Sequence, residues 1–142
     1  MNPIYLLIGT SLAIPSLGFG GENTDPPDKA RIAVVGDADR LNISQAGYCG
    51  KRVDIDHPTD MSFLVPADRK TWFYIQSKFH TPLGTYSCSG DFSFMPASGK
   101  LTIIRYTFPG SSCLLEIFQS LPGQTPVRIK AEREPPRICL LE

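Results

Sequence analysis

Short runs of β-branched and aromatic residues, separated by turn residues at intervals of roughly 8–15 positions, constrain the fold of this chain most strongly. Several runs alternate apolar and polar side chains, as a strand with one buried face does. Eight runs predict strands: residues 30–35, 51–56, 62–65, 71–77, 86–94, 100–108, 113–119 and 127–131. This pattern is typical of a sandwich or a barrel, and we predict an all-β fold, an antiparallel β-sandwich of about seven or eight strands.

Residues 114–121 fit two periodicities. Leu114, Ile117, Phe118 and Leu121 also satisfy the i, i+3, i+4, i+7 spacing of an amphipathic helix. The segment is short and follows a tight turn out of another predicted strand. We therefore predict a strand here, with a helix as the alternative.

The N-terminus indicates export. Residues 2–21 carry no charged side chain, and residues 4–14 are an apolar run, which has the length of a secretory signal and is too short to span a membrane. Gly18 and Gly20 supply the small residues that a signal peptidase requires. An uncleaved anchor or a buried N-terminal strand is the alternative. We predict a signal peptide at 1–20, a flexible leader at 21–29 and a folded β-sandwich domain at 30–142, periplasmic or secreted.

Composition excludes several classes of protein. The 142 residues include 14 Lys and Arg against 14 Asp and Glu, and 42% are hydrophobic. This hydrophobic content argues against intrinsic disorder. Because there is no basic excess to neutralise phosphates, we expect no nucleic-acid partner. We also expect no transmembrane span in the mature form.

The four cysteines, Cys49, Cys88, Cys113 and Cys139, predict two disulfides, because exported chains meet an oxidising environment. A zinc site is the alternative. Zinc ligands usually come in closely spaced pairs, whereas the gaps here are 39, 25 and 26 residues. We therefore expect no bound metal, and the sequence allows three disulfide pairings.

Predicted hairpins suggest one pairing. If the turn at 96–99 closes a hairpin, Cys88 faces about Thr107, and if the turn at 109–112 closes the next, Cys113 faces about Thr107 as well. The two cysteines would then flank one strand at about 9–10 Å, beyond the ~7 Å between Cα atoms that a disulfide tolerates. This disfavours Cys88–Cys113 and leaves two pairings. Of these we predict Cys49–Cys88 with Cys113–Cys139, which ties the proline-rich tail to a nearby strand and an early loop to the sheet, over Cys49–Cys113 with Cys88–Cys139.

The motif Y-S-C-S-x-x-F-x-F-x-P-x-x-G-K at residues 86–100 is followed by S-S-C-L at 111–114 and by Cys139 after prolines, and Val65-Pro66-Ala67 enters a strand. With these motifs the chain resembles a group of small, uncharacterised exported bacterial proteins with four cysteines, over roughly residues 30–139. It lacks their glycine-rich insertion after the first cysteine. The resemblance implies an immunoglobulin-like β-sandwich with two disulfides, and no particular chemistry.

Two acidic motifs suggest ion binding. Asp54, Asp56 and His57 lie close together in the sequence, and a metal-dependent hydrolase built on them would need a further ligand such as His80. We expect instead a solvated loop, no catalytic residue and no cofactor.

Asp37 and Asp39 form a D-x-D pair, but Leu41 occupies the position where a calcium loop needs an oxygen ligand. We predict a turn in which the two carboxylates bind local backbone.

Residues 72–75, Trp-Phe-Tyr-Ile, are apolar on both faces of a predicted strand. One interpretation is a central or covered strand. The other is that Trp72 and Tyr74 lie on a partly exposed face and bind a protein or a glycan, because Trp and Tyr are favoured interface residues.

Three functions remain. We expect a non-catalytic binding or structural module whose partner is an envelope or extracellular protein or glycan. One alternative is an inhibitor or adaptor of an exported enzyme that presents a loop from a disulfide-braced scaffold, although the sequence contains no short loop bounded by cysteines. The other is the metal-dependent hydrolase.

Overall fold

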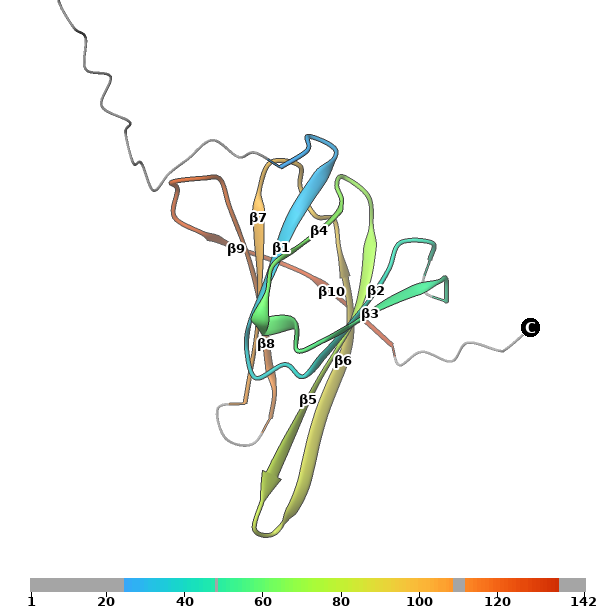
Figure 1. Cartoon of the computed structure of the whole chain (residues 1–142), viewed down its shortest axis with the longest axis vertical. Helices are drawn as coiled ribbons and strands as arrows, with labels where there is room; N and C mark the ends of the chain where they lie inside the picture. Colours follow the sequence, from blue (N-terminus) through green and yellow to red (C-terminus); the bar gives the residue numbers. More distant parts are fainter. Residues whose placement is uncertain (1–24, 48, 109–111, 136–142) are drawn as a thin grey trace, which may run out of the picture.

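The part of the chain that the structure describes forms two five-stranded β-sheets. A computed structural model describes residues 25–47, 49–108 and 112–135. The first sheet has the order β4 (Phe63–Pro66), β1 (Lys29–Gly36), β7 (Leu101–Thr107), β8 (Leu114–Ser120) and β9 (Val127–Ile129). The second has the order β10 (Glu132–Glu134), β6 (Gly84–Phe94), β5 (Thr71–Thr81), β2 (Arg40–Ser44) and β3 (Arg52–Asp56). The two sheets lie as two layers (Figure 1).

The all-β prediction is confirmed, with ten strands in the described part of the chain in place of seven or eight. Within the described residues the only helical structure is one short turn, Pro58–Asp60. These residues therefore contain no helix that is long and apolar enough to cross a membrane. All strand pairs are antiparallel except β1 with β7, which is parallel. The immunoglobulin-like arrangement that the resemblance implies stays a prediction.

The strand prediction for residues 114–121 is confirmed by β8, in which Thr107 of β7 faces Leu114. Ile117 is buried, whereas Leu114 is exposed, so the two lie on opposite faces. The apparent helical stripe therefore does not form one surface. It arises because both faces of this strand carry apolar residues.

The core is built from the inner faces of both sheets. Phe73 and Phe92 are completely or almost completely buried, with ring centroids 5.2 Å apart, and Phe94 stacks on Phe73 at 4.8 Å. From the first sheet, Ile32 and Ile104 are fully buried. These side chains follow the period-2 pattern of their strands, which places alternate residues on one face.

One disulfide joins the two sheets, between Cys88 and Cys113, with 6.2 Å between the Cα atoms. The predicted pairs Cys49–Cys88 and Cys113–Cys139 are therefore wrong. Cys139, like the predicted signal peptide at 1–20, lies outside the described residues.

The reason is the turn at residues 96–99. It joins β6 in the second sheet to β7 in the first, so it closes no hairpin. The register predicted between the strands at 100–108 and 113–119 is confirmed to within one residue, since Thr107 faces Leu114, next to Cys113. Cys88 and Cys113 thus face each other across the sandwich, where the separation between strands of one sheet does not apply.

Residues just ahead of β1 contact the domain. The Asp25 carboxylate pairs with the Arg31 guanidinium at 2.6 Å, and this hydrogen bond holds the pKa of Asp25 below its usual value. The Asp28 carbonyl accepts a hydrogen bond from Ala67 N–H at 2.9 Å. These contacts join the chain before β1 to the edge of the first sheet.

Candidate functional site

The β5–β6 hairpin extends well beyond the two layers (Figure 1). Its register runs from Thr71 opposite Phe94 to Thr81 opposite Gly84. Pairing of β5 with β2 stops at Gln76, and pairing of β6 with β10 stops at Asp91. Residues 78–87, which we call the distal hairpin, therefore have no neighbouring strand among the described residues.

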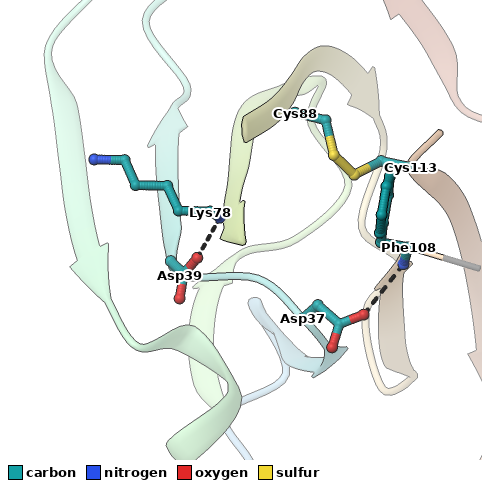
Figure 2. Close-up of a disulfide and its surroundings, with 6 residues drawn as sticks. All are labelled: Asp37, Asp39, Lys78, Cys88, Phe108 and Cys113. Carbon is teal, nitrogen blue, oxygen red and sulfur yellow. Dashed lines mark hydrogen bonds between the residues drawn. A yellow bond between two sulfur atoms is a disulfide. The ribbon is translucent and has the colours of Figure 1, made fainter. Parts of the chain in front are cut away.

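The loop between β1 and β2 supports the base of the distal hairpin (Figure 2). Lys78 N–H donates to the Asp39 carboxylate at 2.5 Å, and Asp39 N–H donates to the Gln76 carbonyl at 2.8 Å. Asp39 thus continues along β5 the hydrogen bonding that β2 provides up to Gln76. The Asp39 carboxylate accepts the backbone N–H of Lys78, as the carbonyl of a neighbouring strand would.

A ring stack provides a second support. The rings of Phe79 and Phe108 stack with their centroids 4.5 Å apart. Phe108 N–H donates to the Asp37 carboxylate at 3.1 Å, which positions the residue that carries the ring (Figure 2). Asp37 and Asp39 therefore bind backbone 71 and 39 residues away, so our prediction that they bind local backbone is wrong.

The disulfide is the third support. Cys88 faces Ser77 in the hairpin register, at the boundary between the buried part of the hairpin and the distal hairpin. Its bond to Cys113 joins β6 to the residue before β8 in the opposite sheet. Contacts from both sheets thus meet at the base of the distal hairpin (Figure 2).

The tip is a two-residue turn of Pro82 and Leu83. Proline presets the backbone φ angle that a turn requires at its first central position. Thr81 Oγ1 donates to the Gly84 carbonyl at 3.1 Å and accepts from Leu83 N–H at 3.3 Å. Leu83 is 90% exposed and Tyr86 is 52% exposed. The tip therefore presents apolar surface on an internally bonded turn.

The proposed hydrolase residues do not converge. Asp56 pairs with Arg40 at 3.7 Å, and Arg40 faces Gln76 across β2 and β5. His80 lies four residues beyond Gln76, about 13 Å further along β5 at 3.3 Å per residue. Its Nδ1 contacts Thr85 Oγ1 at 3.1 Å.

The hydrolase alternative also uses Asp54 and His57. Asp54 lies on the edge strand β3, and His57 follows β3 in a left-handed conformation with φ 51°. Across residues 25–47, 49–108 and 112–135, no three side chains able to ligate a metal form a group. The structure therefore offers no geometric basis for the hydrolase alternative.

Residues 72–75 of β5 have one buried face and one partly exposed face, so each interpretation of this aromatic run describes one face. Phe73 and Ile75 are fully buried on the inner face, whereas Trp72 and Tyr74 are half-buried on the outer face of the second sheet. Lys70 Nζ lies 5.3 Å from the centre of the Trp72 ring. Whether Trp72 and Tyr74 bind a ligand stays a prediction.

A polar pocket of about 530 Å³ lies on this outer face, beside Tyr74. Asn42 is only 8% exposed, and its Oδ1 has no hydrogen-bond partner among the described residues. The pocket draws its lining from all five strands of the second sheet or the turns beside them: Asn42, Arg52, Tyr74, Ser89, Gly90, Asp91, Arg133 and Glu134.

The distal hairpin is not among the features predicted from the sequence. Its signal was present, since a T-P-L-G turn separates the predicted strands at 71–77 and 86–94. The predicted strand ends at residue 77, whereas β5 continues to Thr81. Comparison with protein families, with curated proteins and with solved structures found no match to this chain.

Proposed function

We propose that this chain is an exported, non-catalytic module that binds a partner protein of the cell envelope or extracellular space through the tip of the distal hairpin. The observation that carries the proposal is the 90% exposure of Leu83 at the tip of a hairpin whose base is supported from both sheets. The proposal favours the adaptor alternative over the hydrolase.

Rigidity is what distinguishes this tip from other exposed apolar residues. A single exposed leucine is ordinary on a protein surface. A loop that is already ordered loses less conformational entropy on binding, so more of its contact energy contributes to affinity. Leu83 is exposed at the tip of such a loop, where it can enter an apolar pocket of a partner, and Tyr86 is exposed three residues further along, in β6.

Export is supported by the apolar run near the N-terminus and by the Cys88–Cys113 bond, because disulfides persist mainly in oxidising compartments. We expect the mature protein to begin near Gly21. The intact mass of protein recovered from the envelope or medium of the native host tests this. A species that retains Met1 contradicts the signal-peptide proposal.

A second disulfide, Cys49–Cys139, is part of the proposal. Cys88 and Cys113 are bonded to each other, and Cys49 is not free. Cys139 is the one cysteine of the sequence left to pair with it. Peptide mapping without reduction should show a fragment that joins Cys49 to Cys139.

The binding proposal is tested by site-specific photo-crosslinking in the native host. We expect a discrete crosslinked species with the photoreactive residue at Leu83 or Tyr86. Val127 is a matched control, because it is apolar, 66% exposed and lies on the edge strand β9. Leu83→Asp should remove most of the species formed from position 86, and Val127→Asp should retain it. Equal crosslinking at Leu83 and Val127, or none at Leu83, contradicts the proposal.

A further inference from the structure

We propose that a second copy of this chain pairs antiparallel with β3, with Val53 opposite Val53, so that the second sheets of the two copies form one continuous sheet. The dimer goes beyond the proposed function and does not depend on it. Only the consequence of the dimer for partner binding rests on the distal hairpin.

β3 is an edge strand of the second sheet. It pairs with β2, and no other strand pairs with it among the described residues. Four of its five residues are exposed, and the apolar Val53 is 60% exposed. An edge strand presents backbone N–H and C=O groups with which a strand of another chain can pair.

An apolar groove of about 500 Å³ lies between β3 and β4, the edge strand of the first sheet. Val53 and Ile55 of β3 line it on one side, and Phe63 and Val65 of β4 line it on the other. At the opposite edge of the sandwich the chain passes directly from β9 in the first sheet to β10 in the second. The described residues therefore join the two sheets at one edge and leave an apolar groove at the β3 edge.

The charges of β3 suit a second copy as the partner. When Val53 lies opposite Val53, Arg52 of each copy faces Asp54 of the other on the outer face. Opposite charges that face each other directly across a ladder attract. On the groove side the two Val53 side chains meet, and Lys51 of each copy faces Ile55 of the other, where the apolar stem of a lysine can pack.

Other registers are less favourable. A slip by one residue places the groove side of one strand opposite the outer face of the other. Pairing about residue 54 places Asp54 opposite Asp54, which repels. It also requires Asp56 to face Arg52, although Asp56 already pairs with Arg40 at 3.7 Å.

β10, the other edge strand of the second sheet, lacks this complementarity. Antiparallel self-pairing about Arg133 would place Glu132 opposite Glu134 twice, and like charges directly opposite are destabilising. Of the two edges of this sheet, the β3 edge is therefore the one that suits a second copy.

The dimer determines where the two distal hairpins point. β3 and β5 are both antiparallel to β2, so they run in the same direction. Because the two β3 strands run in opposite directions, the two β5 strands do so as well, and the Leu83 tips project from opposite ends of the continuous sheet. A dimer that binds through these tips therefore bridges two partner molecules.

Sedimentation equilibrium of the purified protein over a concentration series tests the dimer. We expect the wild-type protein to approach twice its monomer mass. Arg52→Asp and Asp54→Arg each place like charges opposite each other at two positions and should weaken the dimer about tenfold or more. Arg128→Asp is the matched control, because Arg128 is exposed on the edge strand β9, and it should dimerise like the wild type.

An equimolar mixture of the Arg52→Asp and Asp54→Arg proteins should regain the dimer, because each variant then faces the opposite charge in the other. The double variant, Arg52→Asp with Asp54→Arg, restores both pairs between identical chains. It serves where a single variant does not fold, which circular dichroism shows.

A monomer mass of the wild-type protein at every concentration overturns the proposal. A dimer that neither single substitution weakens forms through another surface and overturns it as well. A folded mixture or double variant that stays monomeric overturns the register. None of these results affects crosslinking from Leu83 to a partner, so failure of this inference is distinguishable from failure of the binding proposal.

Discussion

The two ends of the β5–β6 hairpin are stabilised by different physics. In the proximal hairpin, residues 71–77 with 88–94, Phe73 and Ile75 are completely buried and Phe92 is 1% exposed. In the distal hairpin, Leu83 is 90% exposed and no neighbouring strand pairs with it among the described residues. The register is continuous through both, so the difference does not come from the pairing of the two strands.

The comparison shows how a protein can extend a hairpin away from its core. A two-stranded hairpin alone is marginally stable in water. Here the boundary between the two parts carries a disulfide, a carboxylate that accepts a backbone N–H, and a ring stack. These contacts order the distal hairpin without covering its tip, so apolar burial is not required where a partner must bind.

The largest effect should come from the proximal hairpin. Phe92→Ala removes a buried ring that stacks on Phe73 and should lower the free energy of unfolding by about 3–5 kcal/mol. Urea unfolding followed by circular dichroism measures it. Met95→Ala is the control, because Met95 is 57% exposed and its truncation should change stability by no more than about 0.5 kcal/mol. Similar losses for both would mean that the proximal hairpin is not part of the core.

Removing the disulfide should come next. Cys88→Ser with Cys113→Ser opens a closed loop of 25 residues, for which loop entropy predicts a loss of about 3.5 kcal/mol, less any strain in the bond. The substitutions should also accelerate amide hydrogen exchange more in residues 78–87 than in residues 71–77, because the distal hairpin loses its covalent support. Equal acceleration in both parts would argue that the bond stabilises the sandwich as a whole.

Removing the carboxylate support should have a smaller effect. Asp39→Ala leaves Lys78 N–H without its acceptor and should lower the free energy of unfolding by about 1 kcal/mol. The exchange rate of the Lys78 amide should rise. Asp60→Ala, at an exposed position on the Pro58–Asp60 turn, is the control and should leave that amide unchanged. If the Lys78 amide stays protected from exchange in Asp39→Ala, its hydrogen bond to the Asp39 carboxylate does not support the distal hairpin.

The smallest effect on stability should be at the tip. Leu83→Asp should change the free energy of unfolding by no more than about 0.5 kcal/mol, since the side chain is almost fully exposed. Thermal unfolding measured beside the crosslinking experiment separates stability from binding. A large loss of stability would show that Leu83 packs within the protein.

Several features of the fold follow from local sequence. The alternation in residues 86–94 places Phe92 and Phe94 on one face, and the structure buries both. The turn at 109–112 predicts the β7–β8 register to within one residue. These inferences hold because strand periodicity and short hairpins depend on neighbouring residues alone.

Two strands were not predicted from the sequence. β2 (Arg40–Ser44) alternates polar and apolar residues, and its Leu41 and Ile43 are buried, so its signal was present; β10 (Glu132–Glu134) contains only charged residues and has none. Both become strands because the backbones of β5 and β6 offer hydrogen-bonding partners beside them. The three residues of β10 are too few to show a strand pattern by themselves.

The disulfide and the base of the distal hairpin depend on contacts distant in sequence. Pro96–Gly99 has the same turn residues whether it closes a hairpin or joins two sheets, and only the pairing of β7 with β1, about 70 residues earlier, distinguishes the two. The partners of Asp37 and Asp39 are likewise 71 and 39 residues away. Composition and spacing thus predicted oxidised cysteines and short strands, whereas the packing of the two sheets selected the cysteine pair and the supports, because those choices are made by residues that meet only in the folded chain.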